Sequence, residues 1–216
     1  MNEYDAYRNR ISASGVNMQD AIYQASKRKI INDLLNSPTL TRVRLNSDRR
    51  YYSVIISDIE TFYKRVVLFM PETVVNVGDY VRHESSTYLA TDCKKDNLYP
   101  QLYVELCNET FVLRKESTKI IIGYDEFKRP IYESTPTNEY QIPCVMTTKI
   151  YSIVDNSAIP LPDGAMMIKM PYIREQIPSV NYIITFHNAQ YKVTTISYEK
   201  VINDVGYIEI RLQRET

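Results

Sequence analysis

The chain has 216 residues but contains no tryptophan, only five glycines and three cysteines, and its formal net charge is zero. So few glycines leave little material for a loop that wraps around phosphate groups. Cys93, Cys107 and Cys144 are too few and too widely spaced for a disulfide framework or a Cys-x-x-Cys metal site. We therefore expect free thiols and synthesis in a reducing cytoplasm.

Long apolar runs are also missing. The longest, at 66–70 and 120–122, fall far short of the roughly 20 residues that a membrane span needs. The chain starts with the polar stretch MNEYDAYRNR, so we expect no signal peptide and no membrane partner. A neutral chain is also not built as a polycation for duplex DNA.

The sequence contains none of the common phosphate-binding, nucleophile-elbow or zinc-protease motifs. Its two histidines, His83 and His187, are expected in surface turns. Pairs of acidic residues at 58 and 60, at 92 and 96, and at 125 and 126 lie in segments typical of turns, where carboxylates are solvated. A hydrolase would need such a pair to converge in a pocket. We expect no catalytic residue, no metal and no cofactor, and hence not an enzyme.

The chain contains nineteen tyrosines, and thirteen short runs rich in β-branched and aromatic residues follow Thr39. Turn signals separate these runs, which is typical of an antiparallel all-β body. Before them, apolar residues recur at helical spacing over 18–36, and Ser37-Pro38 ends the pattern. The sequence predicts an N-terminal helical segment over residues 1–45.

Parts of the β-rich region repeat. Met70-Pro71 recurs as Met170-Pro171, and further on Tyr80 aligns with Tyr182 and Tyr88 with Tyr191. We therefore expect two copies of one β module, at 48–116 and 139–216, joined by 117–138. The predicted fold class is mainly β, with an N-terminal α-helical segment followed by two related small antiparallel β-barrel or sandwich modules.

Four arginines form the best basic cluster: Arg42, Arg44, Arg49 and Arg50. Such charges can protect a strand edge from stray pairing, or they can line a DNA passage in an oligomer. The sequence alone does not decide between these two roles of the arginines. A small Tyr-rich barrel can also stack single-stranded bases, which keeps a single-stranded nucleic-acid-binding module as an alternative.

Several segments, taken in order, resemble a family of neck proteins of tailed bacteriophages that infect Gram-positive hosts. These segments are NSPTL, FMPETVVNVGDYV, TYLATDC, LYPQLYVELCNETFVLR, YQIPCVM, IPLPDGAMMI and YKVTTISYEKVINDVGYIEIRL. Members of the family are head-tail connector or head-closure virion proteins. They often have tryptophan where this chain has Tyr88, and many carry a further immunoglobulin-like domain.

The resemblance implies a virion protein without catalytic residues, made in the host cytoplasm. It implies a homo-oligomeric ring with a portal or adaptor protein on the head side, tail proteins on the other, and non-specific passage of duplex DNA. A tail-completion or distal-tail ring is the alternative within this class. One apolar stripe of the expected helix would dock on its own β body, on a neighbour or on the portal: Ile22, Ile30, Leu34 and Leu35.

Overall fold

The computed structural model describes most of the chain as helix and strand. The described residues are 18–46, 48–59, 61–95, 98–115, 119–124, 126–134, 138–151, 158–160 and 164–215. They divide into two compact units, residues 1–106 and 107–216. The structure confirms the expected fold class: mainly β, with an N-terminal helix and two related barrel modules.

The helix, α2 (Met18–Leu35), carries Asp20 in its first turn, where a negative charge suits the helix dipole. It ends before Pro38, which cannot continue a helix. The backbone N–H of Ser37 donates to the carbonyl of Leu34, and the N–H of Leu40 donates to that of Ser37. These bonds turn the chain directly into the first strand.

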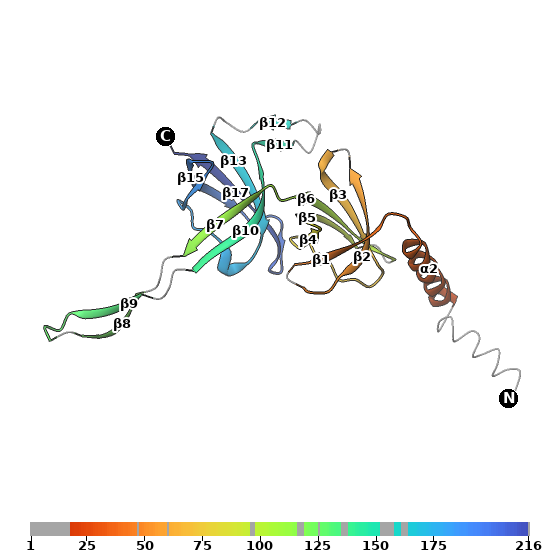
Figure 1. Cartoon of the computed structure of the whole chain (residues 1–216), viewed down its shortest axis with the longest axis horizontal. Coiled ribbons are helices and arrows are strands. Elements are labelled where there is room, and N and C mark those ends of the chain that lie inside the picture. The colour runs from red at the N-terminus through yellow and green to blue at the C-terminus, as the bar shows by residue number, and fades with distance from the viewer. Residues whose placement is uncertain are drawn as a thin grey trace, which may run out of the picture. The chain divides into compact units, whose positions relative to one another are not determined.

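The first unit is a closed antiparallel barrel with the strand order β1-β2-β3-β6-β5-β4, in which β4 pairs back onto β1 (Figure 1). Its alternating side chains fill the interior, as in β1, where Val43 and Leu45 are buried and Arg42 and Arg44 are exposed. The strands are β1 (Leu40–Leu45), β2 (Tyr52–Ile59), β3 (Thr61–Phe69), β4 (Tyr80–His83), β5 (Ser86–Lys95) and β6 (Pro100–Leu106).

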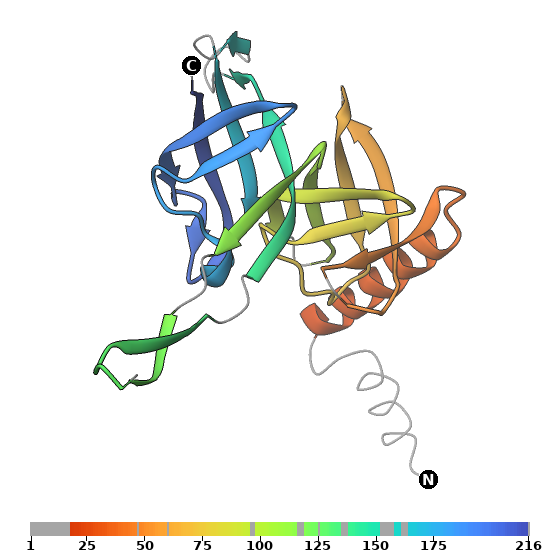
Figure 2. The same ribbon diagram turned by 60° about the vertical axis from the view of Figure 1, so that its left-hand side comes forward.

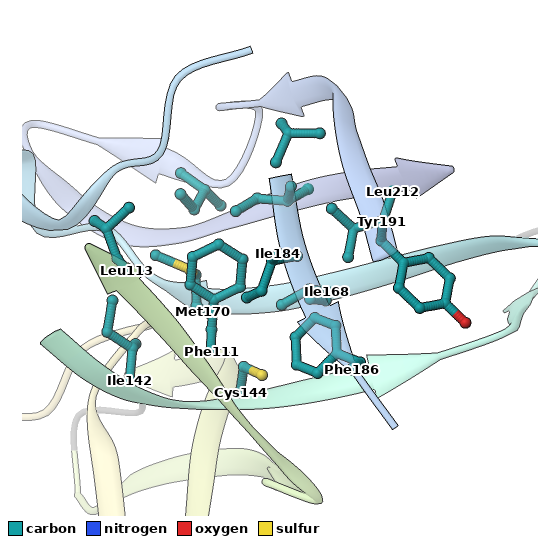
Figure 3. Packing of buried hydrophobic residues seen from close by; sticks show 13 residues of the cluster. Phe111, Leu113, Ile142, Cys144, Ile168, Met170, Ile184, Phe186, Tyr191 and Leu212 are labelled. Carbon is teal, nitrogen blue, oxygen red and sulfur yellow. The ribbon is translucent and has the colours of Figure 1, made fainter. Parts of the chain in front are cut away.

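The second unit is built on a sheet with the order β14-β15-β17-β13-β10-β7, and β16 pairs with β17. Its side chains form one buried cluster that includes Phe111, Cys144, Ile168 and Phe186 (Figure 3). The strands are β7 (Glu109–Lys115), β10 (Asn138–Thr147), β13 (Ala165–Pro171), β14 (Ile183–Phe186), β15 (Ala189–Ser197), β16 (Val201–Ile202) and β17 (Val205–Arg214).

Two strand pairs and a short 3-10 helix are the other described elements of the second unit. β8 (Lys119–Tyr124) pairs with β9 (Pro130–Ser134), and the two form a ribbon of their own (Figure 1). β11 (Lys149–Tyr151) pairs with β12 (Ala158–Pro160). A short 3-10 helix, η1 (Arg174–Gln176), follows β13.

The two barrels have the same topology strand for strand. In chain order, β1, β2, β3, β4, β5 and β6 occupy the places of β7, β10, β13, β14, β15 and β17. This matching corrects the expected module boundaries of 48–116 and 139–216. β1 belongs to the first barrel instead of the helical segment 1–45, and β7 opens the second barrel instead of closing the first, because its whole length pairs with β10.

A β-bulge recurs at the same place in both barrels. Thr91 is the extra residue on β5, and Thr194 is the extra residue on β15. The Thr91 hydroxyl donates to the carbonyl of Tyr103 at 3.4 Å, and the Thr194 hydroxyl donates to the carbonyl of Arg211 at 3.1 Å. These two carbonyls lie at the same register position, so the repeat extends to a local distortion and its hydrogen bond.

The strand pairings also correct the sequence alignment of the two modules. Counted from the bulges, Phe69 occupies the position of Met170, and both side chains are fully buried. Met70 lies one residue further on, so the Met-Pro repeat is out of register. A shift of one residue would turn a strand inside out.

Of the two tyrosine pairs that the sequence repeat aligns, one is equivalent in the structure and the other is not. Tyr88 and Tyr191 both lie three residues before the bulge, and both are buried. Tyr80 begins β4, and its counterpart at the start of β14 is Ile183 instead of Tyr182. The offset between the modules is therefore constant over this hairpin.

Candidate functional surfaces

The seam that closes the first barrel is left open in the second. At one end of the first seam, the backbone N–H of Asn46 donates to the carbonyl of Tyr80 at 2.8 Å. The corresponding N–H in the second barrel belongs to Arg114, and it donates to the hydroxyl of Tyr182, also at 2.8 Å. A tyrosine side chain thus replaces a backbone carbonyl, since no ladder joins β7 to β14 among the described strands.

A histidine bridges the other end of each seam. In the first barrel, Nε2 of His83 lies 3.1 Å from Oγ1 of Thr41. In the second, Nε2 of His187 lies 2.8 Å from Oε1 of Glu109, which occupies the position of Thr41. Both histidines lie at the β-turn end of equivalent hairpins, and each ring contacts the first strand of its own barrel.

Three arginines gather on the outer face of the first barrel. Arg42 and Arg44 are exposed on β1, and Arg82 on β4 is the Cα partner of Arg44. We call these three residues the arginine row. Like charges directly opposite each other destabilise a strand pair. The Nε atom of Arg82 is buried and has no hydrogen-bond partner among the described residues.

Few neighbouring groups offset the positive charge of the arginine row. The guanidinium of Arg44 lies 5.7 Å from the ring centroid of Tyr51, a cation–π contact. In the part of the chain that the structure describes, no carboxylate lies within ion-pair distance of the row. The row is therefore a local excess of positive charge in a neutral chain.

Arg49 and Arg50 are exposed in the loop before β2. The Asp48 carboxylate accepts the backbone N–H of Arg50 at 3.0 Å and the hydroxyl of Tyr52 at 2.9 Å. These two hydrogen bonds lower the pKa of Asp48, because they stabilise its charged form. Thus the structure gives Arg42 and Arg44 a common face with Arg82, while Arg49 and Arg50 lie in a loop with an acidic neighbour.

The four apolar residues of the stripe expected on α2 are not all buried against the barrel. Leu34 is buried and Ile30 is half-buried, but Ile22 and Leu35 are 58% and 52% exposed. α2 lies beside the first barrel (Figure 2), and Lys27 forms an ion pair with Glu72. Between helix and barrel lies an open groove of about 320 Å³, lined by Ile31, Leu35, Tyr51, Tyr52, Ser53, Met70 and Thr73.

The tip of the β8–β9 ribbon exposes large apolar side chains. Tyr124 is 67% exposed, Phe127 is 78% exposed and Ile131 is 45% exposed. The guanidinium of Arg129 lies 5.9 Å from the ring centroid of Phe127. These residues are missing from the candidates that the sequence indicates, although an aromatic residue in a charged turn is a usable signal.

The structure describes three of the six acidic residues that the sequence indicates: Asp58, Asp92 and Glu126. Asp58 pairs with Arg65 at 2.8 Å, and Asp92 accepts the backbone N–H of Cys93 at 2.8 Å. Glu60, Asp96 and Asp125 lie outside the described residues. The described residues contain no group of three or more potential metal ligands, and no helix among them is long and apolar enough to cross a bilayer.

The three cysteines are free thiols, and Cys144 is the most deeply buried. Burial raises the pKa of Cys144 to about 12, because the interior disfavours the thiolate. Burial also raises the pKa of Cys93, which lies on β5 with its Sγ atom 3.8 Å from the carbonyl of Val75. Cys144 packs as a small apolar side chain in the second core.

Comparison with known proteins gives two matches. Residues 116–213 match the YomX C-terminal domain family. This span covers the second barrel without its first strand, β7. The chain is also 31% identical over 138 residues to the SPbeta prophage-derived protein YomX of Bacillus subtilis strain 168. Both matches support a phage origin. The alignment spans 62% of this chain and 63% of that relative, and no solved structure matches.

Proposed function

We propose that this chain is a structural subunit of the neck of a tailed phage. In this proposal, copies of the chain close into a ring between a portal or adaptor protein and the tail proteins, and duplex DNA passes through the ring. The phage origin of the chain and its two barrels of one topology support the proposal. The ring performs no reaction. It retains packaged DNA, offers a docking surface to the tail and provides a passage during ejection.

The arginine row is the observation that carries this proposal. Arg44 and Arg82 are Cα partners across the β1–β4 pair, and Arg42 lies on the same exposed face. This arrangement costs stability in the isolated chain, so it calls for an anionic partner. Phosphate groups of passing DNA would neutralise the row without reading its sequence, which suits a channel that must pass any sequence.

Duplex binding at several salt concentrations tests this role. We expect the triple variant Arg42→Gln, Arg44→Gln and Arg82→Gln to bind duplex more weakly. Its plot of log K against log salt should be less steep by about 2–3 per chain, since each lost phosphate contact removes roughly 0.9. The matched control removes the same charge from the second unit by the changes Arg174→Gln, Arg211→Gln and Arg214→Gln. Equal loss of affinity in both triple variants would contradict a specific role of the row.

The same titrations separate a neck ring from a single-stranded binding module, whereas a tail ring is distinguished by its location in the particle. A single-stranded binding module would prefer a single-stranded oligonucleotide over duplex and would bind it as a monomer. A tail-completion or distal-tail ring would assemble like a neck ring but would occupy another place in the particle.

A further inference from the structure

The β8–β9 tip is built like a contact element. Among the described strands, β8 and β9 pair only with each other, and a lone two-stranded ribbon is marginally stable in water. Despite this, its tip exposes Tyr124, Phe127 and Ile131. Clustered exposed apolar residues on a soluble protein mark interaction sites. We call these three residues the apolar tip.

The groove beside α2 is built like a receptor for such a tip. Five of its seven lining residues are apolar or aromatic, and two of them, Leu35 and Tyr51, are more than half exposed. Its volume of about 320 Å³ offers room for a large side chain. In the isolated chain Leu35 and Tyr51 are largely exposed to water, so covering them would gain hydrophobic free energy.

Charge supports a match between the two surfaces. In the tip, Lys128 and Arg129 follow Phe127 directly, and both are exposed. At the groove, Glu72 precedes the lining residue Thr73, and its side chain is 74% exposed although it pairs with Lys27. An aromatic side chain in the groove would therefore bring a cation of the tip close to an exposed carboxylate.

We propose that the apolar tip of one chain docks in the groove of a second copy of this chain. The inference rests on the proposed ring and names its subunit contact. Tip and groove are different surfaces, so the contact is heterologous. Repetition of one heterologous contact generates a ring when the rotation closes.

Two complementary variants test the contact by native mass spectrometry of the full chain. The tip variant carries Tyr124→Ser and Phe127→Ser, and the groove variant carries Leu35→Asp. All three side chains are more than half exposed, so both variants should fold, which their melting curves verify. The matched control is Ile202→Ser, which removes a 72% exposed apolar side chain from β16.

The inference predicts a result for each of five samples. Wild type and the control assemble beyond the dimer, and each variant alone stays monomeric. An equal mixture of the two variants forms dimers and nothing larger, because one intact tip meets one intact groove.

A tip variant that assembles like wild type would overturn the inference and leave the ring standing. Assembly of the groove variant, with loss only in the tip variant, would also overturn it, since the tip would then bind elsewhere. A wild-type chain that stays monomeric at all concentrations would contradict the proposed ring itself.

Discussion

The hydroxyl of Tyr182 accepts a backbone hydrogen bond at the seam of the second barrel, where a backbone carbonyl accepts it in the first. It accepts the N–H of Arg114 at the position where Asn46 donates to the carbonyl of Tyr80. The ring of Tyr182 also packs on Phe111, with 6.3 Å between centroids. One side chain therefore both fills the space at the seam and satisfies an edge donor of β7.

We expect Tyr182→Phe to lower the free energy of unfolding by about 1 kcal/mol, because the ring stays but the hydrogen bond is lost. Urea unfolding followed by circular dichroism measures the change. Tyr198→Phe is the matched control, since the ring of Tyr198 is 47% exposed and makes an edge contact with Tyr172. Equal effects of the two substitutions would show that the hydroxyl at the seam does not support the barrel.

The thiol of Cys144 gives a second prediction at this scale. A rise in pKa from the ordinary value of 9.0 to about 12 lowers the thiolate fraction about a thousandfold. In the native protein at pH 8, iodoacetamide should therefore modify Cys144 far more slowly than in the unfolded chain. Mass spectrometry of digested samples measures the rates, and equal rates in both states would refute the buried position.

The raised pKa of Cys144 also makes the stability of the fold depend on pH. Below about pH 9, the thiol keeps its proton in both states and contributes no pH dependence. Above pH 9, the unfolded chain releases this proton first, so stability falls as the pH rises toward 12. Cys144→Ala should remove this part of the alkaline slope, although the smaller side chain also lowers stability at every pH.

At the scale of elements, the β8–β9 ribbon is an insertion between two paired strands. Lys115 at the end of β7 and Asn138 at the start of β10 are Cα partners. The β7–β10 ladder is therefore complete without the segment 116–137. The ribbon contributes its exposed tip, while the core of the second barrel comes from other strands.

We expect a chain in which Asn-Gly replaces residues 116–137 to keep the fold of the second barrel. An Asn-Gly pair suits a two-residue turn between antiparallel partners, so Lys115 and Asn138 should still pair. Circular dichroism and thermal unfolding should show one cooperative transition close to that of wild type. Loss of this transition would mean that the ribbon stabilises the barrel itself.

The class of fold follows from local signals in the sequence, but the pairing of its strands does not. The short runs rich in β-branched and aromatic residues after Thr39 predict strands, because that signal is local. The place of β7 depends on its ladder with β10, more than twenty residues away, and its closeness to β6 in the sequence does not reveal this pairing. For the same reason, Arg82 could not be joined to Arg44 before the β1–β4 pairing was known.

The sequence repeat shows a similar limit. The Met-Pro match is one residue out of register with the strand pairings, whereas the bulge threonines, Thr91 and Thr194, align the modules correctly. Chance identity is common among short β segments. A bulge fixes the register of a strand pair, so it locates equivalent residues more reliably than a short sequence match does.

At the scale of the whole molecule, the neutral chain combines two barrels of one topology with three candidate contact surfaces. The arginine row suits contact with phosphate, while the apolar tip and the groove suit contact with protein. A ring around DNA needs both kinds of surface in each subunit. The proposals thus assign the three surfaces to one assembly.

Immunogold electron microscopy of purified phage particles that encode this chain tests the neck assignment most directly. The account predicts label at the junction of head and tail in intact particles, and none at the distal end of the tail. Label at the distal end, or absence of the chain from purified particles, would contradict it.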